Sequence, residues 1–414
     1  MHNKILNIAV IICIVFVNLL STASFAQVKS QTNINHYQVV DTGQEEFFNN
    51  YQIISKPSEG QPFYGQDAHY IRNAPSYSDN GDGTITDRVT GLMWQKGYDV
   101  MTYEEAIEKV KTFNVAKHTD WRIPTIKEAY SLILFSGVDV SSNDMSRLPK
   151  GGIPFIETDF FDFTYGSNGE RVIDVQILSS TIYQGTTMGG QATVFGVNVA
   201  DGRIKGYPIT DLRTRLGKKF TVRFVRGNPN YGKNNFKDNN NGTISDLATG
   251  LMWGKSDSKK AMSWEDALSW AQQKNREKYL GYSDWRVPNA KELQSIVDYS
   301  RSPQKTNSAA INPLFEVSQI IDEGGKTNYP FYWSSTTHKN IRDGREAVYV
   351  CFGEALGYFK PPFSQGRGIL QDVHGAGAQR CDPKTGNPGD YPQGHGPQGD
   401  VVRILHYVRL VRDM

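Results

Sequence analysis

Hydrophobic and polar positions follow the same order twice along the chain. In the first copy, the alternating Thr84-Ile-Thr86 and the run Leu92-Met-Trp94 predict two short strands separated by Gly-containing turns. Apolar residues at helical spacing then predict one helix after Thr102 and another after Thr125. Each Thr is followed three residues later by Glu, the pattern of a capping box. Beyond Gly137 the period is lost, and we expect a long loop region followed by strands.

The same strings return further along the chain, which indicates an internal duplication. The hairpin string at 78–94 is repeated at 238–253. Asp120-Trp-Arg-Ile-Pro-Thr-Ile-Lys-Glu128 is repeated as Asp284-Trp-Arg-Val-Pro-Asn-Ala-Lys-Glu292. Asn289 takes the place of a capping Thr and can cap a helix equally well. Because the last strand of each copy stands close to its end, we expect it to pair with the first strand, so that the two ends of the copy meet.

The repeat sets the expected domain organisation. The predicted parts are a signal peptide at 1–26, a lead-in segment at 27–75, a first repeat at 76–228, and a second repeat at 229–414 with a loop insertion at 360–400. The aromatic residues at 60–70 suggest that this part of the lead-in packs on the first repeat.

The first 26 residues resemble a secretory signal. Lys4 precedes the apolar run Ile5–Leu20, and small residues stand before Gln27. The run is shorter than the ~20 residues of a membrane span. We therefore expect cleavage, no membrane span in the mature chain, and a secreted or periplasmic protein.

Composition narrows the classes of partner. Lys and Arg total 45 against 43 Asp and Glu, so no basic excess points to nucleic acid. Aromatic residues at 12% and frequent Gly favour turn-rich β or α+β structure. After cleavage two cysteines remain, Cys351 and Cys381. In an oxidising compartment they predict one disulfide. The alternative is two free thiols, one in a strand and one in a loop.

Together the repeated strings resemble the bacterial family named for the C-terminal domain of the Legionella collagen-like protein. The resemblance covers about 76–228 and 230–414. It implies an α+β fold of two tandem C-type-lectin-like domains, each with two helices packed on an antiparallel sheet and a long loop region. The family's namesake is an adhesin that binds sulfated polysaccharides, which implies extracellular binding by analogy. This chain lacks collagen-like repeats and has two copies. The signature positions are Trp94, Trp121, Arg122, Pro124 and Glu128, then Trp253, Trp285, Arg286, Pro288, Glu292 and Trp333.

The acidic hairpins invite comparison with a calcium loop. An EF-type loop needs oxygen ligands at its third and fifth positions and Glu at its twelfth. Counted from Asp79, these positions hold Gly81, Gly83 and Thr90. The strings therefore predict hairpin turns with Asx-type hydrogen bonds. We expect no cofactor, with calcium in another geometry left open.

The insertion holds the candidate ligand-binding side chains. They are Asp372, His374, Arg380, Asp382, Tyr391 and His395. Metal binding and anion binding are both conceivable, although the spacing fits no common metal motif. Glycine-rich loops also carry such residues merely solvated. The Trp-Arg-x-Pro strings could offer an aromatic ring and a cation to a sugar, but a buried core position is the more common role.

Three functions follow from these patterns. The first is an exported, non-catalytic binding or adhesion module for a glycan or other cell-surface polymer. The second is a thiol enzyme of the formylglycine-generating type, which the resemblance brings with it, using Cys351 and Cys381. The third is a structural spacer that presents the insertion to a protein partner. No Gly-x-Ser-x-Gly, His-Glu-x-x-His or phosphate-loop motif supports catalysis.

Overall fold

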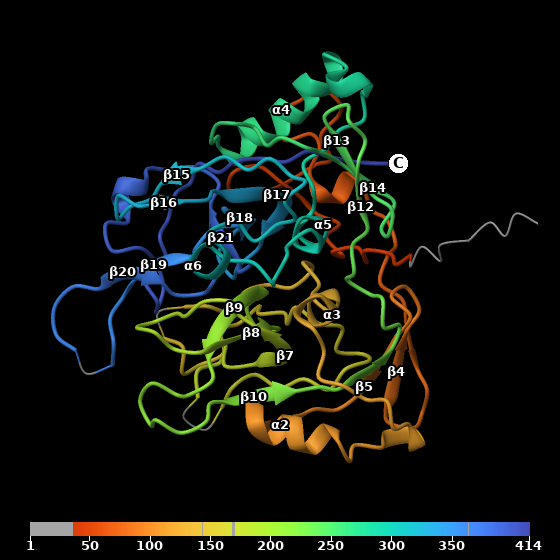
Figure 1. Cartoon of the computed structure of the whole chain (residues 1–414), viewed down its shortest axis with the longest axis vertical. Coiled ribbons are helices and arrows are strands. Elements are labelled where there is room, and N and C mark those ends of the chain that lie inside the picture. The colour runs from red at the N-terminus through yellow and green to blue at the C-terminus, as the bar shows by residue number, and fades with distance from the viewer. Residues whose placement is uncertain (1–35, 143, 168–169, 363) are drawn as a thin grey trace, which may run out of the picture. The chain divides into compact units, whose positions relative to one another are not determined.

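A computed structural model describes residues 36–414 apart from 143, 168–169 and 363 (Figure 1). The predicted signal peptide at 1–26 and the start of the lead-in lie outside the described residues. Within the described part, no helix combines the length and apolar character that crossing a membrane requires. The described part of the chain is mostly sheet with few helices and lies within one compact unit.

Each copy begins with a small antiparallel sheet that its own last strand completes. The first sheet has the order β11-β5-β4-β3, from β3 (Tyr77–Asp79), β4 (Thr84–Asp87), β5 (Leu92–Gln95) and β11 (Val225–Gly227). The second has the order β12-β13-β14-β22, from β12 (Phe236–Asp238), β13 (Thr243–Asp246), β14 (Leu251–Gly254) and β22 (Val411–Asp413). The predicted hairpins are confirmed in both copies. The last strand was expected to pair with the first, but it pairs with β5 in the first copy and with β14 in the second. The first strand of each predicted hairpin, β4 or β13, is already paired on both edges.

The helices begin where the capping patterns predict. The helices are α2 (Tyr103–Val110), α3 (Ile126–Ser131), α4 (Trp264–Arg276), α5 (Ala290–Ser295) and α6 (Pro303–Thr306). Capping boxes form at Thr102, Thr125 and Asn289, each with the Glu three residues on. Each box pairs backbone amides that would otherwise lack partners in the first turn.

The central feature is one eight-stranded sheet built by both copies (Figure 1). Its order is β17-β18-β21-β9-β8-β7-β10-β6. The strands are β6 (Asp99–Thr102), β7 (Gln176–Ile182), β8 (Thr193–Asn198), β9 (Arg203–Pro208), β10 (Lys219–Val222), β17 (Phe331–His338), β18 (Glu346–Cys351) and β21 (Gln379–Pro383). All neighbours are antiparallel except β7 and β10, whereas a purely antiparallel sheet was expected.

The two copies meet through matching positions. Ile204 of β9 lies opposite Gln379 of β21, and each lies opposite a Val of its own copy's neighbouring strand. The signature lysines are exchanged in the same way. Lys127 Nζ donates to the Ser295 carbonyl at the end of α5 (2.6 Å), and Lys291 Nζ donates to the Ser131 carbonyl at the end of α3 (2.9 Å). The interface is therefore self-complementary, as in a two-fold dimer, but within one chain.

The predicted insertion at 360–400 is not a single loop, because it contains strands. In the first copy residues 199–202 join β8 to β9, whereas residues 352–378 join β18 to β21 in the second. The longer connection contains a hairpin of β19 (Leu356–Phe359) and β20 (Ile369–Asp372). The predicted stretch 360–400 thus includes β20 and the central strand β21. Two further hairpins pair β1 (Phe47–Phe48) with β2 (Ile53–Ile54), and β15 (Ile320–Ile321) with β16 (Thr327–Asn328).

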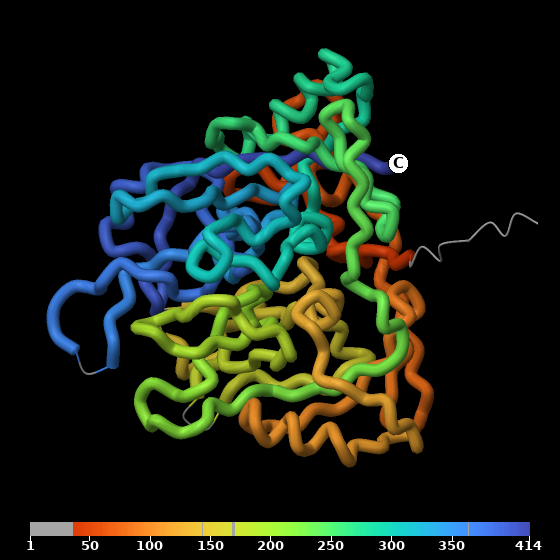
Figure 2. Tube along the Cα trace, viewed as in Figure 1, coloured from red at the N-terminus to blue at the C-terminus, as the bar shows by residue number. Residues whose placement is uncertain are grey.

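Residues 60–70 of the lead-in pack on the second copy, so the expectation that they pack on the first was wrong (Figure 2). The ring of Phe63 lies 6.4 Å from that of Trp264 in α4. The buried Asp67 carboxylate accepts hydrogen bonds from the hydroxyls of Thr42 (2.8 Å) and Thr336. Such a carboxylate needs these donors once it is removed from water.

The contact between the copies leaves no room for a side chain at Gly206. A Cβ there would lie 2.5 Å from the His374 carbonyl oxygen, to which the Gly206 amide donates. We expect Gly206→Ala to cost about 1–3 kcal/mol by overpacking and to lower the melting temperature of the whole unit in one calorimetric transition. Gly254→Ala, where a Cβ would meet ordinary contacts, is the control. An unchanged melting temperature, or two transitions of which one moves, would contradict the shared sheet.

Candidate functional site

A pocket of about 460 Å³ opens in the second copy. Four aromatic side chains line it, namely Phe331, Tyr358, Tyr391 and Tyr407. Its volume is within the usual range for small-molecule sites, and its aromatic walls are typical of them. All lining residues belong to the second copy, so the first contributes nothing to this pocket.

Two of the four aromatic residues come from the two sides of β21, namely Tyr358 from its connection to β18 and Tyr391 from the segment that follows it. Tyr358 is held in β19 by pairing with Leu370 of β20, and its amide donates to the Gly399 carbonyl (2.7 Å). Tyr391 follows the short helix Pro388–Asp390, which the Asn387 side chain caps. Phe331 comes instead from the start of β17. Phe331, Tyr358 and Tyr391 therefore reach the pocket from three separate segments of the second copy.

Arg403 brings a positive charge to the pocket. Its guanidinium lies 3.9 Å from the centre of the Phe331 ring and forms two hydrogen bonds with Glu323, at 2.8 and 2.9 Å. Among the described residues its Nη1 has no hydrogen-bond partner. Because Glu323 uses only Nε and Nη2, Arg403 keeps the two N–H groups of Nη1 for a ligand.

His406 also lines the pocket, and contacts with Asp382 and Trp333 fix the orientation of its ring. Its Nε2 is 3.0 Å from Asp382 Oδ2, and its ring meets Trp333 edge-on at 4.1 Å. Burial lowers the pKa of His406, which keeps the imidazole neutral at pH 7. Asp382 then accepts from the Nε2–H, so Nδ1 carries a lone pair, and within the described part of the chain that atom has no partner.

This polar pair has an aromatic counterpart in the first copy. His406 pairs with Met262 as Phe220 pairs with Met101. By strand register Asp382 corresponds to Tyr207, and Tyr207 and Phe220 stack edge-on at 6.1 Å. The second copy therefore has a hydrogen-bonded Asp–His pair where the first has packed rings.

Two of the six candidate ligand-binding residues belong to this site. Tyr391 lines the pocket, and Asp382 holds His406. His395 is exposed, with its ring 6.3 Å from that of Tyr391.

The other three candidates lie at the contact with the first copy. Tyr183 donates to Asp372 Oδ2 (2.7 Å). Asp400 pairs with Arg380 and, at 2.9 Å, with His374 Nε2. These three side chains are buried, because the segment around β21 is part of the central sheet. We expected them on a loop of the insertion, but Asp372 lies in β20 and Arg380 in β21.

The predicted disulfide is absent, since Cys351 and Cys381 are free. The register places Cys381 opposite Val348, three residues along β18 from Cys351. Three residues of strand span about 10 Å and reverse the face of the sheet, whereas a disulfide needs Cα atoms within about 7 Å.

The signature residues hold each copy together. Arg122 forms an ion pair with Glu128, as Arg286 does with Glu292 at 2.6 Å. The Pro124 and Pro288 carbonyls accept from the amides of the two Ser-Ser-Thr strings at 2.7 and 2.8 Å. The tryptophans Trp94, Trp121, Trp253, Trp285 and Trp333 are all buried. These positions therefore lie in the core rather than at a ligand surface.

The hairpin carboxylates are engaged in the turn. Asp79 accepts from the Gly81 amide (2.9 Å) and pairs with Lys96 (2.6 Å). Asp238 repeats both contacts with Asn240 and Lys255. A different group, His338, Glu346 and Cys381, has metal-ligand chemistry.

The sequence did not predict Phe331, Glu323, Arg403, His406 and Tyr407 as site residues. None of them belongs to a local motif that indicates a ligand site. A comparison of the two copies would have found some of them, because Phe331-Tyr-Trp333 stands where the first copy has Gln176-Ile-Leu178. Positions at which a duplicated copy departs from its partner are the available signal.

Stability should depend on pH through Asp372. Burial, followed by repulsion from Glu354, raises the pKa of Asp372 to about 7. The folded state therefore keeps a proton that the unfolded chain loses near pH 4, and stability falls as pH rises from 4 to 7. We expect Asp372→Asn to lack this fall. Relative to the parent protein, its free energy of unfolding should rise across that range by up to about 4 kcal/mol, and its melting temperature should rise with it.

Melting curves from pH 4 to 8 test this expectation. His374, whose burial lowers its pKa to about 4, contributes the opposite slope in both proteins and cancels in the comparison. Asp390→Asn, at an exposed carboxylate of the same insertion, is the control and should show little trend. Parallel curves for Asp372→Asn and the parent would contradict a protonated Asp372.

Comparison with known proteins identifies the family. The model of the Lcl C-terminal domain matches residues 83–226 and 242–367. No curated protein and no solved structure matches the chain. With two matches that cover more than half of its length, the chain belongs to the Lcl C-terminal domain family and carries that domain twice in tandem.

Proposed function

We propose that this protein is an exported, non-catalytic binding module that recognises a glycan or other cell-surface polymer through the pocket of its second copy. The observation that carries the proposal is the aromatic-walled pocket that contains Arg403 and His406. Export is proposed from the signal-like residues 1–26. A C-type-lectin-like arrangement of each copy is part of the same proposal.

The chemistry of the pocket suits a sugar. The C–H faces of a sugar ring can pack on aromatic side chains, which supply large apolar area at low entropic cost. Its hydroxyls both donate and accept hydrogen bonds. Arg403 Nη1 offers a donor and His406 Nδ1 an acceptor, and neither has a partner among the described residues. One hydroxyl-bearing ligand could satisfy both buried atoms.

Thiol catalysis has less support. Cys351 is fully buried, and the register of β18 and β21 separates it from Cys381. Burial raises the pKa of both thiols, which keeps them protonated and weakly nucleophilic. A paired-cysteine mechanism needs two sulfur atoms within reach of each other and of a substrate.

A protein partner is the second candidate. Ile321 and Leu405 line the mouth of the pocket and are 70% and 49% exposed. Exposed apolar residues beside a pocket are typical of interaction surfaces. A glycan array and a peptide array on the same protein separate the two candidates.

We expect binding to a glycan on an array that includes sulfated and neutral polymers, and a loss of about tenfold or more in affinity for Tyr391→Ala. Tyr391 stands at the end of a loop, so its truncation should leave the melting temperature nearly unchanged. Tyr51→Ala, at an exposed ring in the lead-in, is the control. The proposal fails if no glycan binds, or if Tyr391→Ala binds as tightly as the parent protein.

A further inference from the structure

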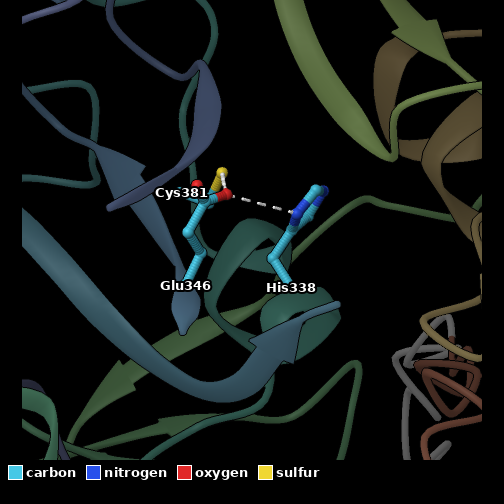
Figure 3. A group of neighbouring side chains, drawn as sticks. All are labelled: His338, Glu346 and Cys381. Atoms are coloured by element: carbon cyan, nitrogen blue, oxygen red, sulfur yellow. Dashed lines mark hydrogen bonds and ion pairs between the residues drawn. The ribbon is translucent and has the colours of Figure 1, made fainter. Parts of the chain in front are cut away.

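Three side chains with metal-ligand chemistry converge where the two copies meet. His338 comes from β17, Glu346 from β18 and Cys381 from β21, three adjacent strands of the central sheet. One donor atom from each lies within 4.8 Å of the others. Figure 3 shows the three side chains directed toward one another. Glu346 Oε2 is 3.0 Å from Cys381 Sγ and 3.8 Å from His338 Nδ1.

The surroundings of His338 fix which nitrogen faces the group. Nε2 lies 2.8 Å from the Asp201 carbonyl oxygen, which can only accept, so Nε2 carries the hydrogen. The ring also stacks on Phe155 of the first copy at 5.3 Å. Burial lowers the pKa of His338, so the imidazole is neutral and Nδ1 presents a lone pair.

That lone pair is the observation that points to a ligand. The His338 side chain is fully buried, and its Nδ1 has no hydrogen-bond partner among the described residues. Glu346 Oε2, which lies 3.8 Å away, is a carboxylate oxygen and is also an acceptor. Two acceptors facing each other in a buried place repel unless a proton or a cation lies between them. A backbone carbonyl that holds the other ring nitrogen is the usual support of a metal-binding histidine.

The charges nearby allow a cation. Arg203 is the closest positive group, with Nη2 3.0 Å from Cys381 Sγ. Two carboxylates, Asp139 and Asp201, offset the charges of Arg203 and Lys205. Arg203 also forms a longer ion pair with Glu346 at 3.8 Å, so the two cations and three carboxylates together carry one net negative charge. A divalent ion bound by one carboxylate and one thiolate is neutral overall.

We propose that His338 Nδ1, the Glu346 carboxylate and Cys381 Sγ form a binding site for a divalent transition-metal ion of the zinc type. Nitrogen, oxygen and sulfur donors together select zinc or cobalt over calcium or magnesium. Ligands of a tetrahedral zinc ion lie about 3.2–3.7 Å apart, given bonds of about 2.0–2.3 Å. The separations of 3.0 and 3.8 Å bracket that range. Binding releases the thiol proton of Cys381 to solvent, and Arg203 then donates to the metal-bound thiolate.

Cobalt(II) titration of the reduced full-length protein tests the site. We expect a thiolate-to-cobalt absorption band that saturates at one equivalent, is displaced by zinc and is lost in Cys381→Ser. Cys351→Ser is the control and should retain the band, because Cys351 lies outside the group. No band in the parent protein, or a band that survives Cys381→Ser, would overturn the proposal.

A second measurement decides the matter if Cys381→Ser does not fold. Zinc should slow alkylation of Cys381 in the parent protein at least tenfold, as read by mass spectrometry of the modified peptides, and should raise the melting temperature. Alkylation of Cys351 should be unaffected by zinc. Equal alkylation of Cys381 with and without zinc would overturn the proposal. The site lies outside the pocket, so its failure would leave the proposed polymer binding untouched.

Discussion

Pairing of β9 with β21 is the contact on which the rest of the molecule depends. A short sheet with an open edge exposes unpaired amides and carbonyls, and such edges are liable to associate with other chains. Each copy has such an edge, and Ile204 and Gln379 bring the two edges together. The duplication therefore removes two edges at once. The exchanged bonds of Lys127 and Lys291 extend the same symmetry to the helices.

The insertion then breaks this symmetry and uses the first copy as support. Asp372 accepts from Tyr183, and the Gly206 amide donates to the His374 carbonyl, so the inserted segment is fastened to the other copy. These contacts hold the segment in place next to Tyr358 and Tyr391, which line the pocket. A binding surface on a rigid element loses less entropy than one on a free loop. The residues that resembled a ligand set are thus the anchors of the site.

Local features were predictable from the sequence because they depend on neighbours in the chain. Thr125 and Asn289 cap helices through bonds three residues away, and Gly81 and Gly83 serve turns that close within the hairpin. The contact between the copies depends on residues far apart, and nothing local distinguishes β9 or β21 as partners. Cys351 and Cys381 illustrate the difference, because a separation along the chain says nothing of strand register. The same limit concealed Arg403 and His406, which become a site only when the sheet brings them to Phe331.

Duplication explains how a buried polar pair could arise without loss of the fold. Both copies keep the signature ion pairs and the buried tryptophans, so the framework of each is the same. In the first copy Tyr207 and Phe220 fill the space with packed rings. In the second, Asp382 and His406 fill it with a hydrogen bond, and the rings of Trp333 and Tyr349, at 4.1 and 4.7 Å from that of His406, replace part of the lost apolar contact. Burial of a polar pair costs stability unless every polar atom has a hydrogen-bond partner. His406 Nδ1 has no such partner among the described residues. Under the proposed function, a ligand hydroxyl that donates to Nδ1 recovers that cost on binding, and we therefore expect the pocket to favour hydroxyl-bearing molecules over purely apolar ones of the same size.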